Sequence, residues 1–188
     1  MSFTNLLDKY GSVDTGYGTD KNTSHSYGPV YDALFMVYKD SATSILEIGF
    51  DSGTSLQVYS EYFTNATIYG IDIKDNCIPH IKTNPRIQMY FGDANSSESI
   101  HGFQGPFDII VEDASHMVHD QIQHFKDYSS KVKQGGVYII EDVNFRNVNL
   151  LRAALESYAA VNGFSMEIID LQNVKERFDD ILFVFKRT

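Results

Sequence analysis

The feature that most constrains the fold of this chain is a glycine turn between an apolar strand and a helix. Residues 44–55 read Ser-Ile-Leu-Glu-Ile-Gly-Phe-Asp-Ser-Gly-Thr-Ser, and a second apolar stretch, 67–71, follows the predicted helix and ends at Asp72. A strand, a glycine turn, a helix and another strand form the unit from which parallel sheets are built. A ligand site can form at such a turn, because ligands bind outside the carboxyl ends of parallel strands.

The rest of the chain predicts further strands of the same sheet. The clearest is the run Phe107, Ile109, Ile110 and Val111, which is typical of a parallel strand buried on both faces. A charged loop joins the last two strands and is too short for a usual crossover helix, so we expect these strands to be antiparallel. We expect strands at 45–48, 67–71, 86–91, 107–111, 137–140, 165–171 and 181–186, and helices at 29–40, 56–63, 78–82, 118–132 and 147–162. Gly135 and Gly136 are expected to end a helix and to precede the fifth strand. The pattern predicts a doubly wound α/β fold, with a mostly parallel seven-stranded sheet, helices on both faces and a C-terminal antiparallel hairpin.

Length, charge and cysteine content exclude several classes of protein. A chain of 188 residues is expected to form one domain, and it can bury a full core. The formal charge of -10 disfavours a non-specific grip on nucleic acid or on an anionic membrane. Cys77 is the single cysteine, so neither a disulfide framework nor a thiolate zinc site is expected, which fits a reducing cytoplasm. We expect no membrane span and no signal peptide.

The N-terminal segment permits two interpretations. Residues 1–27 are rich in glycine and small polar residues, a composition typical of a loop. The segment nevertheless contains Tyr10, Tyr17, His25 and Tyr27, together with the run Tyr-Gly-Thr-Asp-Lys at 17–21. Residues 1–28 are therefore either an expendable arm or a segment that covers the active site, and residues 29–188 are expected to form the single ligand-binding domain.

The glycine turn favours a nucleoside ligand without phosphates. Its pattern is G-x-x-x-G, and Asp51 stands where the dinucleotide fingerprint has its second glycine. A carboxylate there would repel a pyrophosphate, which argues against NAD and for S-adenosylmethionine. Glu47 suits an amino-bearing ligand, Asp72 can accept hydrogen bonds from ribose hydroxyls, and Asp93 can face the adenine.

A second group of polar residues follows the fourth and fifth strands. Asp113, Glu141 and Asp142 would converge at one edge of the cleft, where clustered carboxylates require protons or a cation. Oxygen ligands select magnesium, calcium or manganese, although the same acids could instead cap the following helices. His116 lies near the cleft and can accept a hydroxyl proton, whereas His119 and His124 are expected to face solvent.

These motifs together resemble the class I S-adenosylmethionine-dependent methyltransferases, in particular the metal-dependent sugar O-methyltransferases that act on macrolides and related antibiotics. The resemblance covers the glycine turn with Ile-Tyr-Gly-Ile-Asp at 68–72, Tyr-Gly-Thr-Asp-Lys at 17–21, His-Ser-Tyr at 25–27, Asp-Ala-Ser-His at 113–116 and Glu-Asp-Val at 141–143. It implies that Asp113, Glu141 and Asp142 hold Mg²⁺ or another hard divalent cation, and that His116 is the catalytic base. The methyl donor is expected to contact Tyr27, Glu47, Gly49, Gly53, Ser55, Asp72, Ile73, Asp93 and Asp113.

The leading hypothesis is an O-methyltransferase that uses S-adenosylmethionine and a divalent cation to methylate a hydroxyl of a small molecule. The resemblance implies a sugar or glycosylated acceptor, while a catechol-like diol would suit the same metal chemistry. No inserted segment is large enough for a separate lid, which argues against a large macrolide acceptor. Val-Asn-Phe-Arg follows Glu141 and Asp142 in place of a longer aromatic stretch, so the acceptor pocket is expected to differ from that of the antibiotic-tailoring members. The alternatives are an NAD-binding Rossmann oxidoreductase and a non-catalytic S-adenosylmethionine-binding module, and a homo-oligomer is left open.

Overall fold

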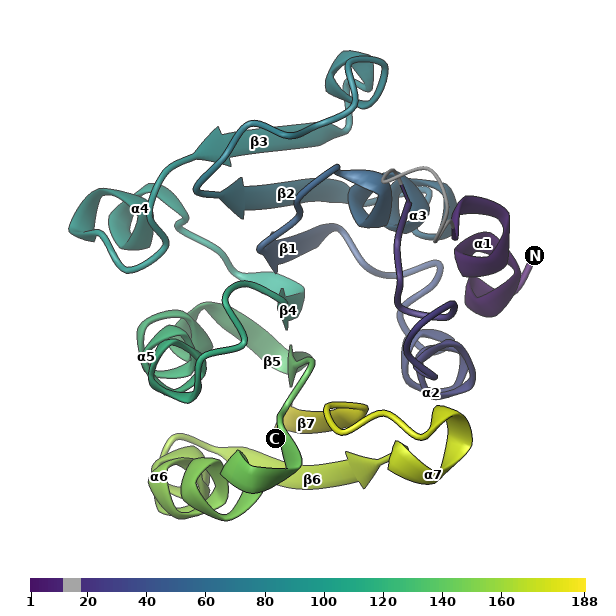
Figure 1. The fold of residues 1–188 in the computed structure, drawn as a ribbon. Helices are drawn as coiled ribbons and strands as arrows, with labels where there is room; N and C mark the ends of the chain where they lie inside the picture. The colour runs from purple at the N-terminus through teal and green to yellow at the C-terminus, as the bar shows by residue number, and fades with distance from the viewer. Residues whose placement is uncertain (12–17) are drawn as a thin grey trace.

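The chain folds around a mixed β-sheet with helices on both faces (Figure 1). A computed structural model describes residues 1–11 and 18–188. Within these residues the sheet has seven strands in the order β3-β2-β1-β4-β5-β7-β6. The strands are β1 (Ser44–Ile48), β2 (Thr67–Asp72), β3 (Ile87–Phe91), β4 (Phe107–Glu112), β5 (Val132–Ile140), β6 (Phe164–Asp170) and β7 (Ile181–Arg187). Strands β1 to β5 are parallel, whereas β7 runs antiparallel to both β5 and β6. The predicted doubly wound sheet with a C-terminal antiparallel hairpin is thus confirmed.

The helices form two layers. The longer ones are α1 (Phe3–Tyr10), α2 (Gly28–Phe35), α3 (Thr54–Tyr62), α4 (Ser97–Gly102), α5 (Val118–Tyr128) and α6 (Val148–Val161). Short turns complete the set: α7 (Gln172–Lys175), η1 (Ile81–Thr83), η2 (Ser129–Lys131) and η3 (Phe145–Asn147). Helices α1, α2 and α3 cover one face of the sheet, and α4, α5 and α6 cover the other (Figure 1).

Alternation along each strand divides the apolar core between the two faces. In β1, Ile45 packs with α1 to α3, whereas Leu46 and Ile48 pack with the opposite layer. In β5, Val137 and Ile139 face the first layer, and Tyr138 and Ile140 face the second. The direction of every side chain at the ends of these strands follows from the same alternation, and that decides the arrangement of the acids described below.

Three of the sequence predictions for local structure were wrong. In place of the helix expected at 78–82, the structure has only the short turn η1 (Ile81–Thr83). Strand β5 begins at Val132, so Gly135 and Gly136 lie inside the strand rather than before it. The pairing of β4 with β5 shifts register between Phe107 and Ile109, which accommodates the glycine pair as an irregularity in the ladder. The loop expected over 1–27 contains helix α1, which is capped by Ser2. Phe3, Leu6 and Leu7 of this helix are buried against α2 and α3.

Residues 18–27 of the N-terminal segment lie at the carboxyl ends of the parallel strands. Tyr17 and the rest of 12–17 lie outside the described residues. Within 18–27, Thr19, Lys21, His25 and Tyr27 are all buried, and the last three contact residues at the ends of β1, β4, β5 or β7. No helix in the described parts of the chain has the length and apolar character needed to cross a bilayer.

Candidate active site

The glycine turn that follows β1 is shaped by a close approach to the end of β4. Gly49 has a φ of +87°, and a Cβ at this position would lie 2.2 Å from the carbonyl oxygen of Asp113. Gly53 has a φ of +78° and directly precedes α3, and a Cβ there would lie 2.7 Å from Cys77 Sγ. Glycine is the residue that fits both constraints, since it adopts positive φ without strain and has no Cβ. The backbone of the turn therefore packs closely against the residue that follows β4.

Asp72 fixes the conformation of this turn. Its Oδ2 atom accepts hydrogen bonds from the backbone N–H of Phe50 at 3.0 Å and of Asp51 at 2.8 Å, while Oδ1 accepts from Lys74 N–H. A carboxylate oxygen has two lone pairs, so Oδ1, which accepts one hydrogen bond here, can accept a further one from a ligand. The acid at the end of β2 is thus part of the scaffold of the turn, and it also lines the adjoining cavity.

A cavity of about 610 Å³ opens above the carboxyl ends of β1, β2, β3 and β4. This volume lies in the range of small-molecule and cofactor sites. The predicted site residues that line it are Gly49, Ser55, Asp72, Ile73, Asp93, Asp113, His116 and Asp142. Gly18, Thr19, Asp20 and Lys21 of the N-terminal segment also line it. The structure therefore brings the glycine turn, the acids after β2 and β3, and the second polar group into one cavity.

Four predicted site residues are not among those that line the cavity. Gly53 lies at the start of α3, close to Cys77. The other three, Tyr27, Glu47 and Glu141, are each at most 1% exposed and lie beneath the cavity. Tyr27 donates a hydrogen bond to Asp142, and Ser55 and Tyr59 both donate to Glu47. Tyr31 donates to Glu141. Tyr27 and Glu47 thus lie beneath the cavity lining in this structure, and their contact with the methyl donor stays a prediction.

Three acids share one face of the sheet because of strand register. Glu47 pairs with Val111, and Glu112 pairs with Ile140, so Asp113 and Glu141 follow side by side at the ends of β4 and β5. Alternation then directs Glu47, Asp113 and Glu141 towards the layer formed by α1 to α3. The ammonium of Lys21 lies between them: Nζ is 3.3 Å from Glu47 Oε1 and closer still to Asp113 Oδ2 and Glu141 Oε2.

This group carries more negative than positive charge. Burial alone would lower the pKa of Lys21, but the charges of Asp113 and Glu141 outweigh it and hold that pKa well above its usual value. Burial raises the pKa of Glu47 to about 7, against the opposing effect of Lys21. Burial also raises the pKa of Glu141 and of Asp142 well above the usual range, and the neighbouring carboxylate of Asp113 adds to both effects. One ammonium cannot balance all four acids in their ionised form, so full ionisation of the group would require an additional cation.

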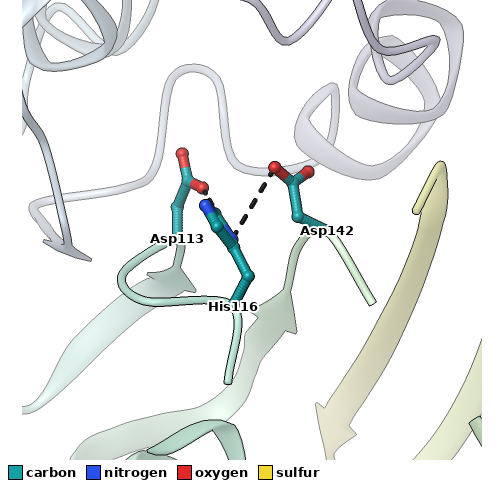
Figure 2. Close-up of side chains that lie close together, drawn as sticks. All are labelled: Asp113, His116 and Asp142. Carbon is teal, nitrogen blue, oxygen red and sulfur yellow. Dashed lines mark ion pairs between the residues drawn. The ribbon is translucent and has the colours of Figure 1, made fainter. Parts of the chain in front are cut away.

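Asp113, His116 and Asp142 come together at the rim of the cavity (Figure 2). His116 Nδ1 lies 3.9 Å from Asp113 Oδ1 and 3.7 Å from Asp142 Oδ2. One ligand atom from each of the three residues lies within 4.8 Å of the others, a spacing that could surround a metal ion. The His116 side chain is 45% exposed, whereas that of Asp142 is 11% exposed. A solvent-accessible imidazole thus lies beside a buried carboxylate.

Backbone conformation marks the same residues. His116 has a φ of 56° and Asp142 a φ of 54°, values that residues other than glycine adopt infrequently. This conformation raises the free energy of the folded state by about 1–3 kcal/mol for each such residue, and residues that adopt it tend to occur at functional sites. Both belong to the cluster of Figure 2; among the other described non-glycine residues, Asp51 at the cavity and Glu176 outside it also have positive φ.

A layer of buried polar side chains supports Asp142 from below. Tyr27 Oη donates to Asp142 Oδ1 at 2.6 Å, and burial raises the pKa of Tyr27, so the phenol remains protonated. His25 stacks on Tyr27 with ring centroids 4.9 Å apart, and its Nε2 lies 3.3 Å from Asp142 Oδ2. Its Nδ1 lies 3.5 Å from Asp180 Oδ1. Burial lowers the pKa of His25 and therefore favours the neutral imidazole.

Several residues of the site were missed by sequence reasoning. Lys21 is the last residue of the Tyr-Gly-Thr-Asp-Lys run, and the sequence analysis gives it no role. Its place in that run, in a chain rich in acids, was the signal that could have identified it as a site residue. His124 was expected to face solvent, yet it is 2% exposed and lies 3.1 Å from Glu112 through its Nδ1 atom. It lies on the inner face of α5 and is one of the residues that line the cavity. His119, on the outer face, has a side chain that is 72% exposed, as predicted.

The residues at the rim fit a hard divalent cation. Asp113 and Asp142 offer carboxylate oxygens, Glu141 lies directly beside them, and cations such as magnesium prefer oxygen ligands. Burial, with the nearby carboxylate of Asp113, raises the pKa values of Glu141 and Asp142, so a proton or a cation is needed beside these carboxylates. In the structure Glu141 is turned towards Lys21 and Tyr31 rather than towards His116.

Known proteins with similar sequences are methyltransferases. Demethylmacrocin O-methyltransferase from Streptomyces fradiae is 33% identical over 148 residues, which cover 73% of this chain and 34% of that protein. 8-Demethyl-8-alpha-L-rhamnosyl tetracenomycin-C 2'-O-methyltransferase from Streptomyces olivaceus is 29% identical over 137 residues, which cover 68% of this chain and 35% of that protein. The chain thus spans about a third of the length of these relatives.

Solved structures show the same fold. MycE methyltransferase from the mycinamycin biosynthetic pathway, in complex with Mg and SAH, superposes with a TM-score of 0.76 at 24% sequence identity. The match covers 100% of this chain and 55% of that one. A family model described as a methyltransferase domain matches residues 20–181, a range that includes the glycine turn and every residue of Figure 2. The chain therefore belongs to the methyltransferase domain family.

Proposed function

We propose that this protein is an S-adenosylmethionine-dependent O-methyltransferase that uses a divalent cation and acts on a hydroxyl group of a small molecule. The observation that carries the proposal is the cluster of Asp113, His116 and Asp142 at the rim of the cavity beside the glycine turn. A module that only bound the methyl donor would have no use for an exposed imidazole beside buried carboxylates. An NAD-binding oxidoreductase is disfavoured because Asp51 in the turn would repel a pyrophosphate.

The methyl donor would occupy the cavity above β1, β2 and β3. Gly49 and Ser55 would lie against its amino-acid end, Asp72 would accept hydrogen bonds from the ribose, and Ile73 and Asp93 would border the adenine. Residues 18–21 would cover one side of it, which supports the reading of residues 1–28 as an arm over the active site rather than an expendable tail. Residues 29–188 would supply the rest of a single donor-binding domain.

Asp113, Glu141 and Asp142 would hold the cation, with Mg²⁺ as the preferred ion. When bound, such a cation lowers the pKa of an acceptor hydroxyl and fixes its position. Tyr27 and His25 would hold Asp142 in place through the contacts described above.

His116 would serve as the general base. Its side chain is exposed to the cavity, and the carboxylates of Asp113 and Asp142 lie 3.9 and 3.7 Å from its Nδ1 atom. An imidazole at this position can take the hydroxyl proton as the oxygen attacks the sulfonium methyl group, which is already activated for transfer. The remaining requirement is geometric: the oxygen must lie in line with the methyl group at about 3 Å.

The acceptor class is proposed from the relatives. The proteins named above methylate, by their names, a rhamnosyl tetracenomycin and demethylmacrocin. A sugar hydroxyl of a glycosylated metabolite is therefore the acceptor that we propose. A vicinal diol would suit the site, because two adjacent oxygens could both face a cation held at the rim.

The proposal is tested by binding and by transfer. Calorimetric titration should show binding of S-adenosylhomocysteine and no comparable binding of NADH. Transfer of a labelled methyl group to glycosides with free sugar hydroxyls should stop in a chelator and return with added Mg²⁺. Tight NADH binding without S-adenosylhomocysteine binding would refute the donor, and full transfer in chelator would refute the role of the cation.

A further inference from the structure

Lys21 is the one residue with a permanent positive charge among the described residues that line the cavity. Aspartates dominate the lining: Asp20, Asp51, Asp72, Asp93, Asp113, Asp120 and Asp142. An acidic lining suits the sulfonium and the amino group of S-adenosylmethionine. It does not suit the carboxylate at the amino-acid end of the same molecule, which requires a positive partner.

The ammonium of Lys21 is occupied in this structure. Its three N–H groups face three carboxylates, those of Glu47, Asp113 and Glu141, within 3.3 Å. The Lys21 side chain is 2% exposed. An ammonium has three donors and no more, so Lys21 has no donor left for a ligand while all three contacts persist.

Two of the three partners of Lys21 are acids that would hold a divalent cation. Asp113 divides its oxygens, since Oδ2 accepts from Lys21 while Oδ1 faces His116. Glu141 is drawn towards Lys21 and away from the rim. A doubly charged ion on Asp113 and Glu141 would compete with the ammonium for the same oxygens and would repel it. The direction open to Lys21 is the cavity, which it already lines.

We propose that Lys21 couples cation binding to methyl-donor binding: a divalent cation on Asp113 and Glu141 releases the Lys21 ammonium, which then pairs with the carboxylate of the donor's amino-acid end. This inference rests on the proposed function, since it takes the donor and the cation from it. Linkage requires reciprocity, so the donor tightens cation binding by the same factor as the cation tightens donor binding. The cation-free enzyme would therefore hold the donor weakly.

The wild-type protein provides the first test. The dissociation constant of S-adenosylhomocysteine is measured by calorimetry in chelator and in saturating Mg²⁺, alongside that of 5'-methylthioadenosine, which lacks the amino-acid end. We expect Mg²⁺ to lower the dissociation constant of S-adenosylhomocysteine about tenfold, a coupling within the usual range for linked sites. The dissociation constant of 5'-methylthioadenosine should change by less than about twofold. Equal effects of Mg²⁺ on the two ligands, or no effect on either, would overturn the inference.

Variants of Lys21 provide the second test. In K21M the effect of Mg²⁺ on S-adenosylhomocysteine should fall below about twofold, because the cationic partner of the carboxylate is gone. K21R keeps the charge and should retain part of the coupling. K9M is the matched control, since Lys9 belongs to the same arm and pairs with Glu61 at the surface. Thermal unfolding confirms that each variant is folded; persistence of full coupling in folded K21M would overturn the inference.

Reciprocity gives a measurement that does not depend on transfer activity. Mn²⁺ binding, followed by electron paramagnetic resonance, should tighten about tenfold when S-adenosylhomocysteine is present. Absence of any S-adenosylhomocysteine binding would refute the proposed function and the inference together. Binding that is tight but indifferent to cations would refute the inference alone and leave the donor assignment intact.

Discussion

Tyr27 and Asp142 form a reciprocal pair across the N-terminal arm and the end of β5. The Tyr27 hydroxyl donates to Asp142 Oδ1 at 2.6 Å, and the backbone N–H of Asp142 donates to the same hydroxyl oxygen at 3.2 Å. Asp142 has a φ of 54°, a strained conformation for a residue other than glycine. The phenol thus makes hydrogen bonds with both the side chain and the backbone amide of a strained residue. The arm therefore takes part in shaping the candidate cation site.

Replacing Tyr27 by Phe should weaken cation binding without removing it. The variant loses the hydrogen bonds of the phenol to the carboxylate and amide of Asp142, each worth about 1 kcal/mol, and a longer one to the carbonyl of Asp179. We therefore expect Mn²⁺ affinity to fall roughly fivefold and the melting temperature to drop by several degrees. Y38F is the matched control, because Tyr38 donates to the backbone of Gly135 at an exposed position. Unchanged Mn²⁺ affinity in Y27F would show that the phenol does not position Asp142.

Replacing His116 should separate catalysis from binding. Asparagine tolerates positive φ better than alanine does, so H116N keeps the backbone conformation while it removes the base. We expect the rate of methyl transfer to fall about 100-fold or more, with little change in the dissociation constant of S-adenosylhomocysteine. H119N is the control, since His119 lies exposed on the same segment. A parallel loss of Mn²⁺ affinity would identify His116 as a ligand and would refute its role as the base.

The sheet and the general location of the site could be predicted from the sequence, because both depend on local patterns. Each of these patterns lies within one short segment: the apolar runs of β1 and β4, and the glycine turn at 49–53. Polar residues that directly follow parallel strands must meet at one edge. Asp113 and Asp142 were found in this way, and the structure places both at the cavity.

The contacts beneath the cavity could not be predicted, because they depend on which faces of distant strands meet. The burial of Lys21 follows from the shared direction of Glu47, Asp113 and Glu141, and that direction requires the register of three strands. The burial of His124 depends on the orientation of α5 against the sheet. The glycine pair in β5 was misread for a similar reason: glycine ordinarily interrupts regular structure, and here the neighbouring strand accommodates it through a register shift.

The stability of the cation-free protein should fall as pH rises through the range in which Glu47 ionises. Its pKa is raised by burial from the usual 4.5 to about 7, so the folded chain retains a proton that the unfolded chain has already released. The contribution of Glu47 is therefore fully present below about pH 4.5 and is lost by about pH 7, with a total of roughly 3 kcal/mol. Urea unfolding in chelator between pH 5 and pH 8 would measure it.

E47Q removes the ionisable group and should flatten this part of the stability profile. E61Q is the control, because the pKa of Glu61 is lowered by the hydrogen bonds from Tyr10 and Gln57, which outweigh the opposing effect of its partial burial. Its titration therefore lies below the tested range. A profile of E47Q that declines as steeply as that of the wild type would show that Glu47 is not the group responsible.

Replacing Asp72 should weaken donor binding while leaving the cation site intact. In D72A the N–H groups of Phe50 and Asp51 lose their acceptor, and a bound ribose would lose its partner as well. We expect the dissociation constant of S-adenosylhomocysteine to rise by about 10- to 100-fold, because a charged acceptor contributes more than a neutral one. D72N keeps one acceptor oxygen for the turn but loses the charge, so it should lie between D72A and the wild type. D75A is the control, since Asp75 pairs with Lys82 outside the cavity. Mn²⁺ affinity measured on the cation alone should stay within about twofold for all three variants, because Asp72 touches none of the acids at the rim; a large loss in D72A would mean that the turn and the cation site are not independent.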